Sequence, residues 1–306
     1  MTVTTPRPRW LSFLIGVGGG VLGLLPWLVG GGRMLLQNLW TVYVPPEQMP
    51  FVLLPVSQYS ALLLFSLVLI GGVFVGLAVR LVGRGMAAWP GSMGLLLVHV
   101  VATVQSFIVL HGGLGLDGGG DPRATVYFAG MLGGTILTVL LAQLAFWMTS
   151  RRSAGVAALG VALAAVSFAN WAMRWVVAFT GEALVPMWIT SVARWVPAVV
   201  VGLALVWCGV RPLWRLVVWA VALLALWIVP ALYTALSYGL GMRVLDGDVP
   251  EMLRAAAQVF PMALAIEWLP VVVAAGIGVV GTVGRMLVGR LRPQSQAMPS
   301  PSRSKS

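Results

Sequence analysis

Stretches of about twenty apolar residues recur along this chain and are separated by short connections rich in arginine, glycine and proline. A helix needs about 20 such residues to cross the ~30 Å hydrocarbon core of a bilayer. Only 9% of the 306 residues are charged and 59% are hydrophobic, whereas a soluble domain carries about 25% charged residues. This balance excludes an ordinary globular domain. The sequence therefore predicts an all-α fold, a polytopic integral membrane helix bundle.

Eight transmembrane helices fit the apolar pattern. They form one transmembrane helical domain over residues 1–292, and the Ser/Pro-rich tail 293–306 is predicted to be disordered and cytoplasmic. The proline-containing segment 31–57 is expected to lie along the membrane interface. The predicted spans are roughly 10–30, 58–79, 93–112, 126–149, 154–173, 186–210, 216–239 and 261–284.

The charged residues indicate how the chain is threaded. With eight spans, one end of the bundle collects arginine and lysine without any acid, and all eight acids lie toward the other end. We call these the basic end, marked by Arg80 and Arg151, and the acidic end, marked by Asp117 and Asp121. Because cytoplasmic loops are enriched in Lys and Arg, the basic end is predicted to face the cytoplasm. We expect a multi-pass protein of the cell membrane with both termini cytoplasmic (N-in, C-in). The net charge of +11 thus reflects topology, and no nucleic-acid partner is expected.

One motif occurs twice inside otherwise apolar segments: Arg194-Trp195-Val196-Pro197 and Glu267-Trp268-Leu269-Pro270. Counted from the basic end at 1.5 Å per residue, both charges lie roughly 25–27 Å along parallel helices. A charge at the centre of a bilayer costs roughly 2.5–3.5 kcal/mol, and an ion pair would offset much of that cost. The alternatives are that each side chain reaches the interface separately, or that a water-filled site uses one or both.

Three further polar residues are candidates for the same neighbourhood: Asn170, Arg174 and Tyr233. Four prolines within the spans are predicted to break helices near the acidic end, because each removes a hydrogen bond to the fourth preceding residue. These are Pro26, Pro197, Pro230 and Pro270. Together they predict an outward-facing vestibule or a loosely packed outer half. A short helix from 249 to about 260, capped by Asp248, is expected to lie flat on the outer leaflet before Pro261 restarts the chain as the last span.

Glycine pairs four residues apart predict close helix packing. Gly16 with Gly20 and Gly19 with Gly23 fall in the first span, and Gly130 with Gly134 falls in the fourth. Packing within the chain is the main interpretation, and association with a second copy is the alternative.

His99 and Gln143 each lie about eight residues from the basic end of their spans. Equal depth predicts an interhelical hydrogen bond worth roughly 0.6–2 kcal/mol. A proton-relay histidine is the alternative, although a relay needs acidic partners that these halves of the spans do not supply.

The sequence contains no HExxH, P-loop or GxSxG motif, and its two histidines and single cysteine do not predict a metal site. We therefore expect no catalytic residues, metal or cofactor. The main hypothesis is a non-enzymatic envelope or membrane-complex helper whose partners are the lipid bilayer and another membrane protein, or itself through the glycine-rich spans. The alternatives are a transporter or channel with a vestibule near Arg194 and Glu267, and an intramembrane enzyme acting on a lipid.

Overall fold

The protein is a bundle of long helices. The computed structural model describes residues 8–35, 39–41, 43–83, 86–118, 121–181, 184–241 and 249–291. These ranges contain no β-strand, only an isolated antiparallel bridge between Arg33 and Phe51. Within them, seven helices are long and apolar enough to cross a membrane, or eight if one bent pair counts as a span. This confirms the all-α, polytopic helix bundle.

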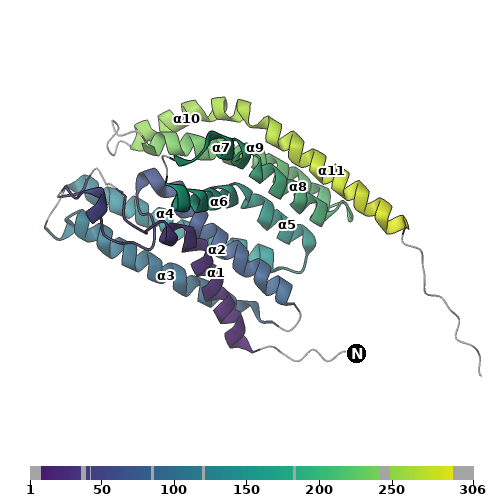
Figure 1. Cartoon of the computed structure of the whole chain (residues 1–306), viewed down its shortest axis with the longest axis horizontal. Coiled ribbons are helices and arrows are strands. Elements are labelled where there is room, and N and C mark those ends of the chain that lie inside the picture. The colour runs from purple at the N-terminus through teal and green to yellow at the C-terminus, as the bar shows by residue number, and fades with distance from the viewer. Residues whose placement is uncertain are drawn as a thin grey trace, which may run out of the picture.

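Seven helices or helix pairs follow the first seven predicted spans closely, but the last apolar helix begins at Trp268 and not at residue 261 as predicted. The predicted cap Asp248 and the tail 293–306 lie outside the described residues. The bent pair is α5 and α6, which meet at an angle of 53°. Neither proline nor glycine stands at this bend, so the sequence carried no signal for it. The helices are α1 Arg9–Val29, α2 Ala61–Val82, α3 Ala88–Gly113, α4 Pro122–Ser150, α5 Ala154–Leu163, α6 Ala165–Thr180, α7 Met187–Ala193, α8 Val196–Cys208, α9 Arg215–Gly241, α10 Val249–Ile266 and α11 Trp268–Leu291, with short 3-10 turns η1 Pro46–Gln48, η2 Gln58–Ser60 and η3 Leu116–Gly118 (Figure 1).

Two groups of helices pack side by side. One apolar core joins α1, α2, α3 and α4, and a second joins α5, α8, α9 and α11. Helix α6 contacts α1 and α2 on one side and α8 and α9 on the other. Figure 1 accordingly shows α5 and α6 between the first four helices and the last five. The middle helices therefore hold the two groups together.

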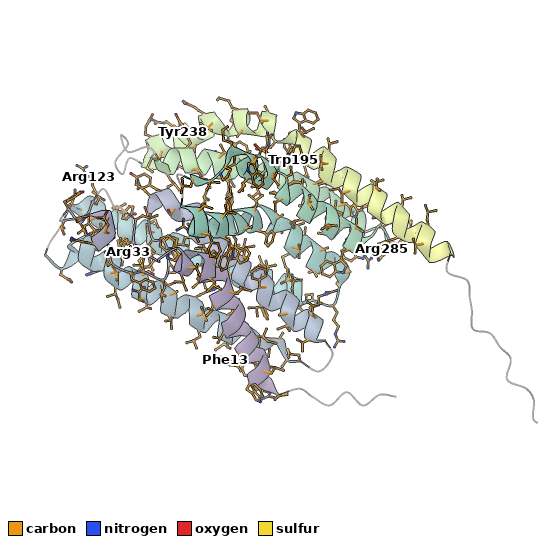
Figure 2. All side chains as sticks on the ribbon, viewed as in Figure 1. Phe13, Arg33, Arg123, Trp195, Tyr238 and Arg285 are labelled. Atoms are coloured by element: carbon orange, nitrogen blue, oxygen red, sulfur yellow. The ribbon has the colours of Figure 1, made fainter. Side chains whose placement is uncertain are left out.

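The basic and acidic ends lie at opposite ends of the bundle. At the basic end, Arg80 donates to the carbonyl of Arg151, and Arg215 donates to the carbonyl of Cys208 at 2.5 Å. Figure 2 shows Arg285 toward this end and Arg123 at the other. The ion pairs of arginine among the described residues lie near the acidic end, Arg123 with Asp121 and Arg254 with Glu251. A ring nitrogen of His111 also lies 3.7 Å from a carboxylate oxygen of Asp117 there.

The glycines of α1 face two different helices. A Cβ at Gly16 would lie 2.2 Å from the carbonyl oxygen of Gly91 in α3, and one at Gly23 would lie 2.6 Å from that of Leu67 in α2. Both distances are too short for any side chain, so only glycine allows these backbones to approach. The pair Gly16 and Gly20 faces α3, and the pair Gly19 and Gly23 faces α2. Packing within the chain is confirmed for this span.

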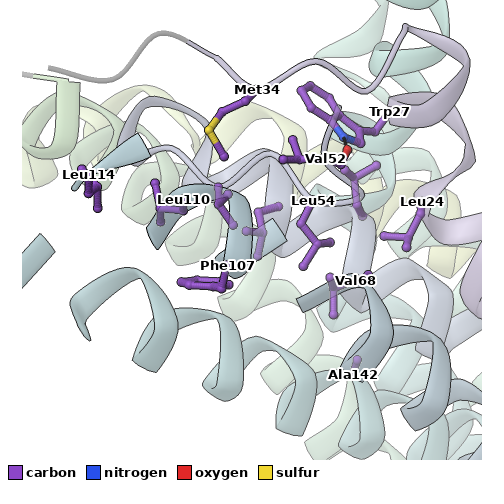
Figure 3. Packing of buried hydrophobic residues seen from close by; sticks show 14 of the residues in the cluster. Leu24, Trp27, Met34, Val52, Leu54, Val68, Phe107, Leu110, Leu114 and Ala142 are labelled. Carbon is purple, nitrogen blue, oxygen red and sulfur yellow. Dashed lines mark hydrogen bonds between the residues drawn. The ribbon is translucent and has the colours of Figure 1, made fainter. Parts of the chain in front are cut away.

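Residues 52–57, the last part of the segment before α2, are mostly buried in the protein, so the expectation of a position along the membrane interface was wrong for them. Earlier residues of the segment such as Tyr43 and Phe51 are exposed. Val52 and Leu54 have no exposed surface. The indole N–H of Trp27 donates to the carbonyl of Val52 at 2.9 Å, and the N–H of Leu54 donates to the hydroxyl of Ser106 at 2.8 Å. Side-chain partners thus satisfy a non-helical backbone inside the bundle, as such a segment requires. Figure 3 shows Val52 and Leu54 among the buried side chains of the first core.

Two of the four predicted helix breaks do not occur. Helix α1 continues through Pro26 to Val29, and α9 continues through Pro230 to Gly241. A proline removes one hydrogen bond of the helix. Trp27 and Ala231, the residues that follow these prolines, are buried, so other parts of the protein surround both turns.

Helix α10 was predicted to lie flat and to end near Pro261, and the structure corrects both expectations. The helix continues through Pro261 and packs antiparallel along α9. The indole N–H of Trp227 donates to the carbonyl of Leu264 at 2.9 Å. A Cβ at Gly239 would lie 2.7 Å from the carbonyl oxygen of Met252, so this small residue lets the two backbones meet.

Candidate functional site

Both copies of the repeated motif stand at a break between two helices. Arg194 and Trp195 separate α7 from α8, and Glu267 alone separates α10 from α11. Pro197 and Pro270 each fall in the first turn of the helix that follows, where a missing N–H costs no intrahelical hydrogen bond. The two prolines therefore mark true helix starts, and the charged residue precedes each start.

Helices α8 and α11 pack against each other and bring the two motifs to the same level. A Cβ at Gly202 would lie 2.7 Å from the Cβ of Ile277, and one at Gly281 would lie 2.4 Å from a methyl group of Val206. Both contacts join residues 75 positions apart, which fixes a parallel register. In this register Arg194 lies within about 3 Å of the level of Glu267. The predicted equal depth of the two charges thus agrees with the packing.

Equal depth does not produce an ion pair. Among the described residues, no carboxylate lies within 4.0 Å of the guanidinium of Arg194, and no base lies within that distance of Glu267. Arg194 is exposed and Glu267 is half-buried.

Asn170 and Tyr233 find their partners at the junction of α2, α6 and α9. The hydroxyls of Tyr233 and Ser167 lie 2.8 Å apart, and the amide of Asn170 donates to the hydroxyl of Ser66 at 3.5 Å. None of the hydrogen bonds among the described residues joins these side chains to the Arg194 and Glu267 level. The structure thus forms a separate polar junction that the sequence did not indicate.

Arg174 also turns away from the repeated motifs. Its guanidinium carbon lies 5.2 Å from the ring centroid of Trp27 in α1, which is a cation–π distance. A Cβ built on Gly30 would lie 3.0 Å from the same guanidinium. Arg174 therefore belongs to the contact between α6 and the end of α1.

The predicted bond between His99 and Gln143 is not formed. Gln143 instead accepts from the hydroxyl of Ser92 at 2.6 Å. His99 is fully buried beside Gly71, and neither ring nitrogen meets a hydrogen-bond partner among the described residues. Ser92 lies almost two turns closer to the basic end of α3 than His99. Gln143 therefore pairs with a residue at a different level of α3 from the one predicted.

A cleft of about 830 Å3 lies between α2, α4 and α9, in the half of the bundle toward the acidic end. The sequence predicted a loosely packed outer half but placed the opening at Arg194 and Glu267, which do not line this cleft. Of the candidate residues, Tyr233 lines it. The walls also include Gln58, Tyr59, Leu62, Phe65, Arg123, Val126, Tyr127, Gly130, Gly134, Thr135, Leu137, Thr138, Leu141, Leu232, Leu236, Leu240 and Met252.

Gly130 and Gly134 of α4 line this cleft, and no described helix packs against them. A Cβ built on Gly130, Gly133 or Gly134 would meet nothing within 4 Å. The prediction that Gly130 and Gly134 pack within the chain was therefore wrong for this span, and association with a second copy stays a prediction. Sequence spacing alone does not separate a glycine that meets a neighbour from one that faces open space.

The described residues contain no group of three or more His, Cys, Asp or Glu side chains that could hold a metal ion. Comparisons with protein-family models, with curated proteins and with solved structures found no match for this chain.

Proposed function

We propose that this protein is a non-enzymatic helper of a membrane complex, and that it docks a second membrane protein on the face around Arg194 and Glu267. It would lie in the cell membrane with its basic end and both termini in the cytoplasm. The excess of arginine at the basic end supports this orientation.

The observation that carries the proposal is the pair of opposite charges at one level, each without an ionic partner among the described residues. A charge near the apolar layer is costly unless it is paired or hydrated. A neighbouring protein with an acid and a base at that depth would offset the cost for both Arg194 and Glu267. Charges so arranged also fix the depth and orientation at which the partner docks.

The helices that carry these charges expose large apolar surfaces. No residue of α7 is buried, and Trp188 and Val192 are 67% and 58% exposed. On the other helix, Trp268 and Val272 are each 56% exposed. Aromatic and aliphatic surface around a charged pair is the composition expected of a docking face.

The transport hypothesis is less well supported at this position. A vestibule was expected beside Arg194 and Glu267, but the cleft of about 830 Å3 lies against α2, α4 and α9. The two charges stand at the outer surface of α8 and α11 and do not line that space.

Site-specific photo-cross-linking in native membranes tests this proposal. A photoreactive amino acid replaces Val192 or Val272 at the proposed face, and Ile108, which is 67% exposed on α3, serves as the control position. We expect one discrete cross-linked product of higher mass from the first two positions and none from Ile108. Arg194→Glu should remove the product, and Arg194→Lys should retain it because the charge is kept.

Two results would contradict the proposal: cross-links to lipid alone, or a product that persists unchanged in Arg194→Glu. A product of twice the chain mass would identify a second copy as the partner. In that case the double variant with Arg194→Glu and Glu267→Arg should restore the product that either single change removes.

A further inference from the structure

The wall of the cleft between α2, α4 and α9 is apolar even where it contains hydroxyl groups. Thr135 and Thr138 each donate to a carbonyl one turn back in their own helix, at 2.8 Å. The hydroxyl of Tyr233 is bonded to Ser167. These groups have partners already, so they offer little to a polar solute. A molecule that binds against this part of the wall must itself be apolar.

The open glycines turn the exposed side of α4 into a groove. Gly130 and Gly134 lie one turn apart, and a side chain added at either would meet no neighbour within 4 Å. The lining residues of α4 run from Pro122 to Leu141, a length of about 28 Å. Half of a bilayer with its headgroups measures about 20–22 Å. The groove is thus long enough for a chain that extends through one leaflet.

The end of the cleft nearest the acidic end of the bundle is polar. Arg123 lines it together with Gln58 and Tyr59. Asp121 lies 3.8 Å from the guanidinium of Arg123, and both side chains are about half exposed or more (61% and 48%). An exposed ion pair of this kind is worth about 0–1 kcal/mol and is easily exchanged. The guanidinium of Arg123 is therefore able to bind a phosphate, because its planar array of N–H donors matches the spacing of phosphate oxygens.

We propose that this cleft binds one phospholipid, with an acyl chain along Gly130 and Gly134 and its phosphate at Arg123. An apolar trough with one cationic end matches a hydrocarbon chain with one anionic group.

Native mass spectrometry of delipidated protein in detergent tests the assignment. The probes are phosphatidylglycerol and a diacylglycerol with the same chains, which lacks the phosphate. We expect one phosphatidylglycerol per chain and at least about fivefold weaker binding of the diacylglycerol. Arg123→Gln should weaken phosphatidylglycerol binding by a similar factor and leave diacylglycerol unchanged. Gly134→Leu should remove both lipids by filling the groove.

Matched controls come from outside the cleft. Arg254→Gln removes an exposed arginine at the same end, and Gly276→Leu fills an open glycine of α11. Both should bind phosphatidylglycerol as the unaltered protein does.

Equal binding of the two lipids, or undiminished binding in Arg123→Gln, would overturn the phosphate assignment. Unchanged binding in a folded Gly134→Leu protein would overturn the chain site. If Gly134→Leu does not fold, Gly130→Leu gives the same test, because it places the same side chain one turn away in the groove. This outcome is independent of the cross-linking result at Arg194.

Discussion

The hydroxyl groups of Tyr233 and Ser167 lie 2.8 Å apart and join α9 to α6. The ring of Tyr233 also lines the cleft and meets the ring of Phe65 edge-on, with centroids 6.0 Å apart. One side chain therefore holds a wall of the cleft against the middle of the bundle. Because α6 contacts both groups of helices, this bond also connects the second group to the first.

Tyr233→Phe should lower the free energy of unfolding by about 0.6–1.7 kcal/mol, since it removes an interhelical hydrogen bond and little volume. Thermal unfolding in detergent measures the change. Tyr238→Phe on the same helix is the control, because Tyr238 is 48% exposed. Equal losses in the two variants would show that the Ser167 bond contributes nothing specific.

Gly16→Ala should destabilise the protein by about 1–3 kcal/mol, because its new Cβ would lie 2.2 Å from the carbonyl oxygen of Gly91. Gly18→Ala in the same helix should change stability by less than about 0.5 kcal/mol, because nothing lies within 4 Å of that position. Denaturation in mixed detergent compares the two proteins. A Gly16→Ala protein as stable as Gly18→Ala would contradict the close packing of α1 on α3.

His99→Met should leave stability nearly unchanged or raise it, although the residue is fully buried. Its ring nitrogens lack partners among the described residues, so an apolar side chain of similar size removes an unsatisfied polar group. Gln143→Met should instead cost about 1–2 kcal/mol, because Ser92 loses its acceptor. The unfolding midpoints of both variants test this contrast. A large loss in His99→Met would reveal a bonded group at the imidazole.

Cysteine labelling tests the orientation in the membrane. The single native cysteine, Cys208, is fully buried, so it gives little background. A membrane-impermeant maleimide should label Gly118→Cys, near the acidic end, in intact cells. Ser153→Cys, between α4 and α5 at the basic end, should react only after permeabilisation, because basic loops stay in the cytoplasm. The reverse pattern would invert the proposed topology.

The glycine pairs show how far spacing alone can be taken. Gly16 and Gly20 are four residues apart and meet α3, while Gly130 and Gly134 have the same spacing and face open space. The periodicity of one helix states which residues share a face. It does not state whether another helix covers that face, so spacing alone did not reveal that Gly130 and Gly134 line a cleft.

The two repeated motifs show that spacing also predicts the depth of a charged residue but not its partner. Their spacing from the basic end was enough to place Arg194 and Glu267 at one level, because the rise of a helix is constant. Whether the side chains meet depends on how α8 and α11 are rotated against each other, and in this structure they form no ion pair.

The sequence by itself determined the class of fold and the position of nearly every span, because both depend on local apolar length and on the placement of charges. Only the tertiary structure decided which glycines are covered, which prolines interrupt a helix and where the cleft opens. Those features depend on contacts between segments far apart in the chain, such as Gly16 with Gly91 and Tyr233 with Ser167, and no local pattern encodes such contacts.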